Sequence, residues 1–320
     1  MPKAFVTGAA GFVGSHLCEY FLERDWIVVG LDNVLTGSES NIDSFRERFK
    51  DKFVFRRGDA TSRMEVAGPF DYVLHFASPA SPADFERYAI EILKAGSVGT
   101  VHTLDLARKT GARFLLASTS EVYGDPQEHP QKETYFGNVN PVGPRGVYDE
   151  AKRFAEAFTM ACHRFHGQDT RIVRIFNTYR PRMRVDDHRS VPEFIKRALH
   201  NEPILVHGDG SQTRSFCYIS DLIEGIFKLL TSARDDLVEP VNIGNPDEIQ
   251  IVELAKRIIA LSGSRSEIVT NIERQPGDPQ MRKPDITRAR ESLNWTPKVP
   301  LDQGLQQTIE DFRHRFRGVQ

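Results

Sequence analysis

TGAAGFVG, residues 7–14, lies between the apolar run 4–6 and a stretch with helical periodicity. The apolar side of that stretch includes Val13, Leu17 and Phe21. Glycines at a strand-to-helix junction permit a tight turn, bring backbone N–H groups close to a pyrophosphate, and let the helix pack on the strand. The spacing is GxxGxxG rather than GxGxxG, and a turn without any ligand is the alternative. The stretch predicts the first strand and helix of a dinucleotide-binding fold.

Apolar runs alternate with helical periodicities through the first half of the chain. They lie at 26–31, 53–55, 72–76, 114–117 and 172–176. Continuous hydrophobicity is typical of strands that are covered on both faces. The clearest helix has an apolar stripe made of Ala151, Phe154, Ala155, Phe158, Ala161, Cys162 and Phe165. Repeated strand–helix units predict an α/β fold with a doubly wound parallel sheet of the Rossmann type.

The 320 residues are enough for about two domains. After residue 176 the rhythm changes, with several prolines and a Gly-Asp-Gly turn at 208–210. Two helices are expected there, near 221–230 and 251–261. We expect residues 1–177 to form an NAD-binding Rossmann domain, with a return segment near 217–247 that includes a strand around 241–243. Residues 178–320 are expected to form mainly a smaller, mixed substrate-binding domain.

Composition excludes several classes of protein. The chain has 42 Lys and Arg residues and 44 Asp and Glu residues, which gives a net charge of −2. It has no block of basic residues of the kind that would indicate a nucleic-acid partner. No apolar run approaches the roughly 18 residues of a spanning helix, and the first residues leave no room for a secretory signal, so we expect a cytoplasmic protein without membrane contact. The cysteines Cys18, Cys162 and Cys217 are scattered and odd in number, which predicts reduced thiols and no metal site.

Two acidic residues follow predicted strands. Asp32 ends the second strand, where a carboxylate accepts hydrogen bonds from the adenosine ribose and repels a 2′-phosphate, so NAD is favoured over NADP. Asp59 follows the third strand and suits the adenine edge. The alternatives are a turn cap for Asp32 and a solvated loop position for Asp59.

Tyr148 and Lys152 lie four residues apart, which places both on one face of a helix. An ammonium beside the phenol, together with a nicotinamide charge, would lower the pKa of the tyrosine from about 10, so that it removes a hydroxyl proton during oxidation of an alcohol. The alternative is that both side chains are simply exposed on a helix. The serine- and threonine-rich segment 117–124, which comes shortly before them, argues against a chance occurrence of this spacing.

Taken together, these motifs resemble those of the extended short-chain dehydrogenase/reductases that act on nucleotide sugars, and among them the UDP-glucuronate decarboxylases. The matching stretches are GAAGFVGSHL from Gly8, HFASPASP from His75, LLASTSEVYGDP from Leu115, NPVGPRGVYDEAKR from Asn140, RIFNTY from Arg174, GDGSQTRSFCYISDL from Gly208, VNIGNP from Val241 and RKPDI from Arg282. Related 4,6-dehydratases usually have Thr-Asp-Glu where this chain has Thr119-Ser120-Glu121, and related 4-epimerases usually lack the acidic pair.

The resemblance implies roles for six catalytic residues. Tyr148 would be the general base, Lys152 its electrostatic partner, and Thr119 a hydrogen-bond donor to the sugar 4-oxygen. Ser120 would lie beside them, and Glu121 and Arg282 would handle the C5 and carboxylate end, with a solvent-facing ion pair as the alternative for both. The implied reaction is NAD-dependent conversion of UDP-glucuronate through a 4-keto intermediate to UDP-xylose.

The resemblance also implies two sets of binding residues. Those for NAD are Gly8, Gly11, Phe12, Val13, Gly14, Asp32, Asn33, Thr36, Gly37, Asp59, Ala60, Phe76, Ser78, Lys94, Tyr148, Lys152, Thr178 and Arg189. Those for the UDP-sugar are Asn177, Arg214, Tyr218 and Arg282. A surface charge is the alternative for Arg214, and a core position is the alternative for Tyr218. Relatives form homodimers through a four-helix bundle, for which the helices near 89–109 and 148–165 are candidates.

Three positions depart from the family pattern. Arg180 stands where Gly is usual, and Arg184 stands where His is common. Residues 94–96 read Lys-Ala-Gly where the family usually has Lys-Thr-Asn, so Gly96 replaces an Asn. A side chain at Arg180 would be strained if its φ were positive, and this predicts some release of UDP-4-keto-pentose before the final reduction. The alternative functions are a UDP-glucuronate 4-epimerase, a 4,6-dehydratase, and a non-catalytic NAD-sensing protein.

Overall fold

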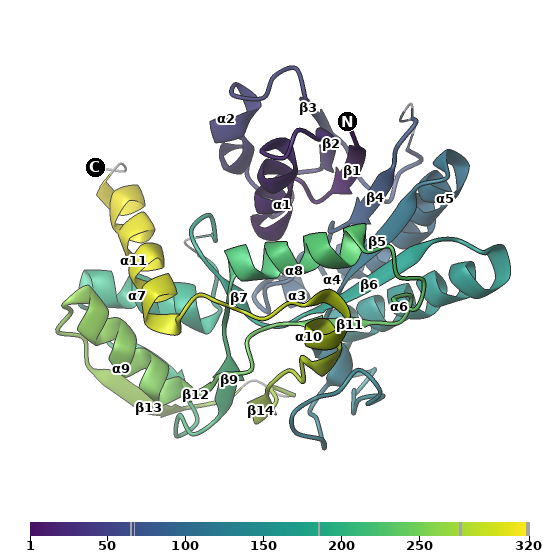
Figure 1. Ribbon diagram of the computed structural model, residues 1–320. Coiled ribbons are helices and arrows are strands. Elements are labelled where there is room, and N and C mark those ends of the chain that lie inside the picture. The colour runs from purple at the N-terminus through teal and green to yellow at the C-terminus, as the bar shows by residue number, and fades with distance from the viewer. Residues whose placement is uncertain (65, 67, 185, 275–276, 318–320) are drawn as a thin grey trace.

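The computed structural model describes residues 1–64, 66, 68–184, 186–274 and 277–317, and it is built around a seven-stranded parallel sheet (Figure 1). The strand order is β11-β6-β5-β4-β1-β2-β3. The strands are β1 (Lys3–Thr7), β2 (Ile27–Asp32), β3 (Phe53–Arg57), β4 (Tyr72–His75), β5 (Arg113–Thr119), β6 (Thr170–Ile175) and β11 (Val241–Ile243). The order reverses between β1 and β4, and open α/β sheets bind ligands at such a switch point. The predicted doubly wound α/β fold is confirmed.

Helices cover both faces of this sheet. Those that belong to it are α1 (Phe12–Leu22), α2 (Ser40–Arg46), α3 (Asp84–Arg87), α4 (Ala89–Lys94), α5 (Thr100–Thr110), α6 (Gly146–His166) and α8 (Ile219–Thr231). A π-helical turn, η1 (Ala95–Gly99), joins α4 to α5, and a 3₁₀ turn, η2 (Ser120–Tyr123), follows β5. Leu17 of α1 and Leu222 of α8 share one buried cluster, and Leu104 of α5 and Ala155 of α6 share a second. Continuous apolar strands are explained by these two covered faces.

The apolar stripe of α6 is only partly packed. Ala151, Ala155 and Cys162 are buried, but Phe154 is 44% exposed and Phe165 is 81% exposed. The stripe therefore contributes its alanines and Cys162 to the core, whereas Phe154 and Phe165 lie outside it. All three cysteines are buried and free.

The C-terminal half contributes small sheets beside the large one. They comprise β7 (Thr178–Tyr179) with β10 (Cys217–Tyr218), β8 (Ile204–His207) with β13 (Ile268–Ile272), and β9 (Thr213–Ser215) between β12 (Glu248–Gln250) and β14 (Met281–Arg282). The helices here are α7 (Ser190–His200), α9 (Ile251–Ser262), α10 (Thr287–Leu293) and α11 (Leu301–Arg317). From this half, β11 joins the large sheet, with Val241 opposite Val173 of β6. The division of the chain at residue 177 stays a prediction.

Candidate active site

One cavity of about 1160 Å³ runs along the carboxyl ends of the strands in the large sheet. Most of the residues that the sequence predicts for the site line it. They are Gly8, Gly11, Phe12, Val13, Gly14, Asp32, Asn33, Thr36, Gly37, Asp59, Ala60, Phe76, Ser78, Lys94, Thr119, Ser120, Glu121, Tyr148, Lys152, Asn177, Thr178, Arg189, Arg214 and Arg282. The fold thus brings both predicted binding sets, apart from Tyr218, to one cavity. Ligand contact by each residue stays a prediction.

The glycine-rich turn is shaped by close backbone contacts. Gly8 has φ +74° and donates its N–H to the Leu31 carbonyl at 2.8 Å. A Cβ at Gly14 would lie 2.0 Å from the Gly8 oxygen, so a side chain cannot be accommodated there. Helix α1 begins at Phe12 without a side-chain cap, and its first N–H groups are available to an anion. The turn therefore fits a pyrophosphate.

Asp32 lies at the end of β2 with its carboxylate fixed. Its Oδ2 accepts the N–H of Ala10 at 2.9 Å, and its Oδ1 accepts the N–H of Val34 at 2.8 Å. Asp59 accepts a hydrogen bond from the Asn33 amide at 3.1 Å. Both carboxylates line the end of the cavity beyond the glycine-rich turn, which is consistent with an adenosine position.

Tyr148 and Lys152 lie on the first turns of α6, where both are buried and line the cavity. The Lys152 ammonium donates to the Ala117 carbonyl at 3.0 Å, and burial lowers the pKa of Lys152 to about 8. Burial of the phenol, and next the negative charge of Glu121, raise the pKa of Tyr148 above its usual value. The expected lowering by Lys152 applies to the complex in which the nicotinamide charge is also present, and it stays a prediction.

Glu121 lies between two arginines. Arg145 Nη2 contacts one carboxylate oxygen and Arg282 Nη1 contacts the other. Burial disfavours the charged carboxylate, but the positive charges of Arg282 and Arg145 hold the pKa of Glu121 well below its usual range. Arg282 also donates from Nη2 to the Gly124 carbonyl at 2.8 Å. The structure thus shows a buried carboxylate that stays ionised because two cations neutralise it.

Arg145 is a cavity residue that the sequence reasoning missed. It directly precedes α6, one helical turn before Tyr148, inside a stretch that the resemblance had already matched. Its position three residues before the tyrosine was the available signal. Only the fold shows that its side chain turns toward Glu121.

The UDP end of the predicted site divides into two parts. Asn177 and Arg214 line the cavity, and Arg214 Nη2 contacts Asp278 Oδ1 at 2.9 Å. Tyr218 lies outside it: the ring packs edge-on against Tyr179, and the hydroxyl donates to Gln307 at 2.5 Å. The assignment of Tyr218 to the substrate is therefore wrong, because its side chain is directed into the core between the C-terminal elements.

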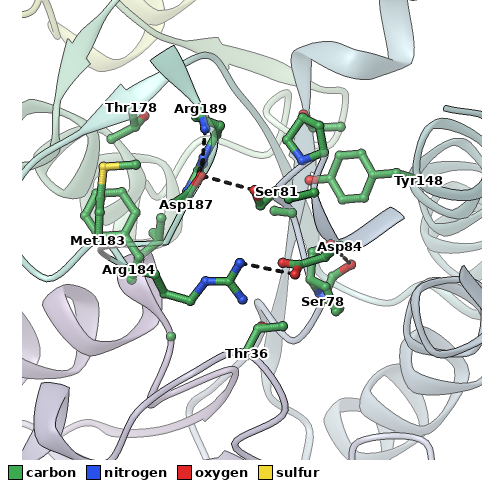
Figure 2. Close-up of a pocket in the computed structure, with 18 of the residues that line it drawn as sticks. Thr36, Ser78, Ser81, Asp84, Tyr148, Thr178, Met183, Arg184, Asp187 and Arg189 are labelled. Carbon is green, nitrogen blue, oxygen red and sulfur yellow. Dashed lines mark hydrogen bonds and ion pairs between the residues drawn. The ribbon is translucent and has the colours of Figure 1, made fainter. Parts of the chain in front are cut away.

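Figure 2 shows a set of polar contacts across the cavity, between the segment after β7 and the segment after β4. Arg184 Nη2 contacts Asp84 Oδ1 at 3.1 Å, and Ser81 Oγ donates to Asp187 Oδ1 at 3.1 Å. Arg189 contacts the same Asp187 carboxylate through Nε and Nη2. Sequence reasoning missed Asp84, Ser81 and Asp187, since their partners lie about a hundred residues away.

The three departures have different structural settings. The positive φ expected near Arg180 occurs instead at Arg182, with φ 73°, so the strain argument for Arg180 is wrong. A Cβ at Gly96 would lie 2.7 Å from both the Cβ and the oxygen of Ala151. Gly96 therefore allows η1 to contact α6 between Tyr148 and Lys152. Arg184 forms the ion pair with Asp84 described above.

Within the described ranges, no group of three His, Cys, Asp or Glu side chains is placed to hold a metal ion. Across the same part of the chain, every helix is too short or too polar to span a lipid bilayer.

Comparison with known proteins gives consistent matches. The family model described as GDP-mannose 4,6 dehydratase matches residues 5–308. UDP-glucuronic acid decarboxylase 2 of Arabidopsis thaliana is 46% identical over 99% of this chain and 70% of its own length. UDP-glucuronic acid decarboxylase 1 of Xenopus tropicalis is 45% identical over 97% of this chain and 72% of its own length. The crystal structure of UDP-glucuronic acid 4-epimerase from Bacillus cereus with UDP-glucuronic acid and NAD has a TM-score of 0.88 at 28% identity, covering 98% of this chain and 99% of that one.

Proposed function

Because the chain belongs to the GDP-mannose 4,6-dehydratase family and is 45–46% identical to UDP-glucuronic acid decarboxylases over nearly its whole length, we propose that it converts UDP-glucuronate to UDP-xylose with bound NAD. One observation carries the proposal. A single cavity contains the glycine-rich turn, the Tyr148–Lys152 pair and the Glu121–Arg145–Arg282 cluster. These are the parts needed to hold a dinucleotide, to remove a hydroxyl proton and to receive a carboxylate.

The residues present fit NAD. The start of α1 has no side-chain cap and Gly14 has no side chain, so N–H donors and space are left for the pyrophosphate. The Asp32 carboxylate disfavours a 2′-phosphate. The chemistry that NAD supplies when bound is the reversible oxidation of the sugar C4 hydroxyl.

The residues of this chain then have distinct tasks. Tyr148 removes the proton of the 4-hydroxyl, Thr119 hydrogen-bonds to the same oxygen, and the charged form of Lys152 stabilises the phenolate. The buried, raised-pKa state of Tyr148 in the protein alone means that a positive charge beside it is required before it acts as a base.

Loss of carbon dioxide follows from the position of the ketone. A 4-keto uronic acid is a β-keto acid, so the electron pair of the breaking C5–C6 bond moves to the C4 oxygen as an enolate. The protein has to orient the carboxylate and stabilise this oxyanion, which Thr119 is placed to do as a donor. Protonation at C5 and reduction at C4 complete the cycle.

The alternative activities are less consistent with the side chains. A 4,6-dehydratase needs an acid at the position of Ser120, which is 1% exposed and has no ionisable group. A 4-epimerase of an uncharged UDP-hexose has no use for the two arginines around Glu121. A UDP-glucuronate 4-epimerase would bind the same carboxylate, so the mass of the product separates it from a decarboxylase. A non-catalytic NAD-sensing protein would not need Tyr148 and Lys152 in the cavity.

The test is incubation of the purified protein with UDP-glucuronate and NAD, following product mass and NADH absorbance together. We expect loss of carbon dioxide, formation of UDP-xylose and no lasting NADH. UDP-4-keto-pentose with an equal amount of NADH would indicate release before the reduction. An unchanged mass with a new stereoisomer would identify an epimerase, and no conversion would favour the sensing protein.

We further propose a homodimer formed through two helical segments of each copy, the continuous segment α4–η1–α5 and α6. Large apolar side chains are exposed along them: Ile90 at 58%, Leu93 at 37%, Val98 at 40%, Val101 at 36% and Phe154 at 44%. Two copies of this face would form a four-helix bundle. Light scattering is expected to give twice the chain mass, and Val98→Glu is expected to give the monomer. A cytoplasmic location is proposed from the three free thiols and is tested by cell fractionation.

A further inference from the structure

The two arginines that contact Glu121 differ in how many of their N–H donors remain free to bind a ligand. Arg282 is 3% exposed in its side chain, donates to Glu121 and to the Gly124 carbonyl, and its Nε is buried without a partner. Because that Nε has no accessible surface, it is out of reach of a ligand. Arg282 therefore serves mainly to hold Glu121 and the turn at Gly124.

Arg145 keeps donors on the cavity side. Its side chain is 13% exposed and lines the cavity, and only its Nη2 is used by Glu121. Among the described residues, Nε and Nη1 of Arg145 have no hydrogen-bond partner. An arginine with one edge occupied and another edge accessible can receive a second carboxylate.

The guanidinium of Arg145 is held in position. It lies 5.6 Å from the centroid of the Phe85 ring, and that ring stacks on Tyr148 at 5.1 Å. A Cβ at Gly277 would lie 3.4 Å from Arg145 Cδ, so the segment at Gly277 contacts the other part of the stem. A positioned guanidinium loses less conformational entropy when it binds a carboxylate.

The charges of the cluster match a carboxylate ligand. Glu121 offsets one of the two arginines, which leaves one net positive charge in a buried region. Arg214 is already paired with Asp278 at 2.9 Å. Asp149 also lies near, and its burial, and next the charge of Glu121, raise its pKa to about 7, so near neutral pH it offsets only part of that charge. The positive charge that remains favours one incoming carboxylate.

We propose that Arg145, rather than Arg282, is the residue that binds the C6 carboxylate of the UDP-sugar and distinguishes UDP-glucuronate from an uncharged UDP-hexose. This inference rests on the proposed function. Sharing Arg145 with Glu121 also limits how strongly the ground-state carboxylate is held, since excessive ground-state stabilisation would slow the loss of carbon dioxide.

The test compares the affinities of UDP-glucuronate and UDP-glucose, which differ at C6, for the NAD-loaded protein. Calorimetry is done in a Tyr148→Phe background, in which turnover is expected to be about 10²- to 10⁴-fold slower. Arg145→Gln is expected to weaken UDP-glucuronate binding about 10- to 100-fold, the loss of one charge-assisted contact, and to change UDP-glucose binding less than about threefold. Arg164→Gln, which alters an exposed arginine of the same helix, is the matched control and is expected to change neither. Equal losses for both ligands, or no loss, would overturn the proposal.

A second comparison separates direct binding from an effect through Glu121. In a Glu121→Gln background, a direct contact predicts that Arg145→Gln still weakens UDP-glucuronate selectively, whereas action only through Glu121 predicts no further loss and overturns the proposal. If Arg145→Gln does not fold, Arg145→Lys, which keeps the charge and loses the planar donors, is expected to show a smaller loss of the same selectivity. Failure of the proposed function is seen separately, as wild-type protein that releases no carbon dioxide from UDP-glucuronate.

Discussion

The Lys152 ammonium lies 5.6 Å from the centroid of the Tyr148 ring, and it is buried. Its hydrogen bond goes to the Ala117 carbonyl at 3.0 Å rather than to the phenol. The two side chains therefore interact through charge across a short gap. Burial, which lowers the pKa of Lys152 to about 8, makes that charge sensitive to pH.

The protonation of Lys152 predicts a pH-dependent contribution to stability. Its ordinary pKa of 10.5 falls to about 8 in the fold, so between these values the unfolded chain holds a proton that the folded chain has released. The contribution of Lys152 to the free energy of unfolding should therefore rise with pH across this window and stay constant below it. Urea unfolding at pH 7.5 and 9.5 should show that wild type gains stability relative to Lys152→Met. The same comparison with Lys256→Met, a surface change, should show no trend. A difference that falls with pH would contradict the assignment.

Removal of the Tyr148 hydroxyl should greatly slow turnover without loss of fold. Tyr148→Phe keeps the ring that stacks on Phe85 but cannot accept the 4-hydroxyl proton. We expect kcat for carbon dioxide release to fall by about 10²- to 10⁴-fold, the usual range for a general base. Tyr72→Phe, on β4, provides the control and should keep the wild-type rate. Equal rates for the two variants would remove Tyr148 from the mechanism.

The charge of Asp32 should set the choice between the two dinucleotides. Asp32→Asn keeps an oxygen that can accept one of the N–H groups of Ala10 and Val34, but it removes the negative charge that repels a 2′-phosphate. The ratio of NADP to NAD affinity, measured by calorimetry, should rise by about tenfold or more, an effect of roughly 1.4 kcal/mol. The variant Asp105→Asn, which alters a half-buried carboxylate of α5 that does not line the cavity, should leave the ratio unchanged. An unchanged ratio in Asp32→Asn would mean that the carboxylate serves only as a turn cap.

A buried ion pair connects the catalytic helix to the sheet. Glu156 of α6 accepts from Arg174 Nε at 2.9 Å and Nη2 at 2.7 Å, and also from Ser118 Oγ at 2.5 Å. Glu156→Ala leaves the arginine charge buried and should lower the free energy of unfolding by about 3–5 kcal/mol. The double variant Glu156→Ala/Arg174→Met should recover part of this loss, as urea titrations would show. Additive losses would indicate that the two residues are not coupled.

The fold was predictable because its signals are local. Glycine spacing in residues 7–14 and continuous apolar runs identify a covered parallel sheet within short windows of sequence. The contacts between distant segments were not predictable in the same way. Arg184 and Asp84 meet only because the chain folds back across the cavity, and no periodicity reports that approach.

In the candidate site, too, local sequence motifs were predictable and contacts between distant segments were not. Residues within matched stretches, such as Tyr148 and Lys152, are brought to the cavity, whereas Tyr218 is directed into the core by packing against Tyr179. Arg145 was missed although it lies in a matched stretch, since its importance comes from the contact with Glu121. Exposure of Phe154 and Phe165 depends on where the core ends, which a helical stripe does not specify.

The pairing of β11 with β6 has a consequence for protein synthesis. When residues up to 177 have emerged from the ribosome, the strand that pairs with β6 has not yet been made. The backbone N–H and C=O groups on that edge of β6 are then unpaired. The missing strand arrives only when Val241–Ile243 emerge, so the large sheet is completed together with the segments that are translated after residue 177. A stop codon between these points would therefore yield an aggregation-prone fragment rather than a minimal cofactor-binding module.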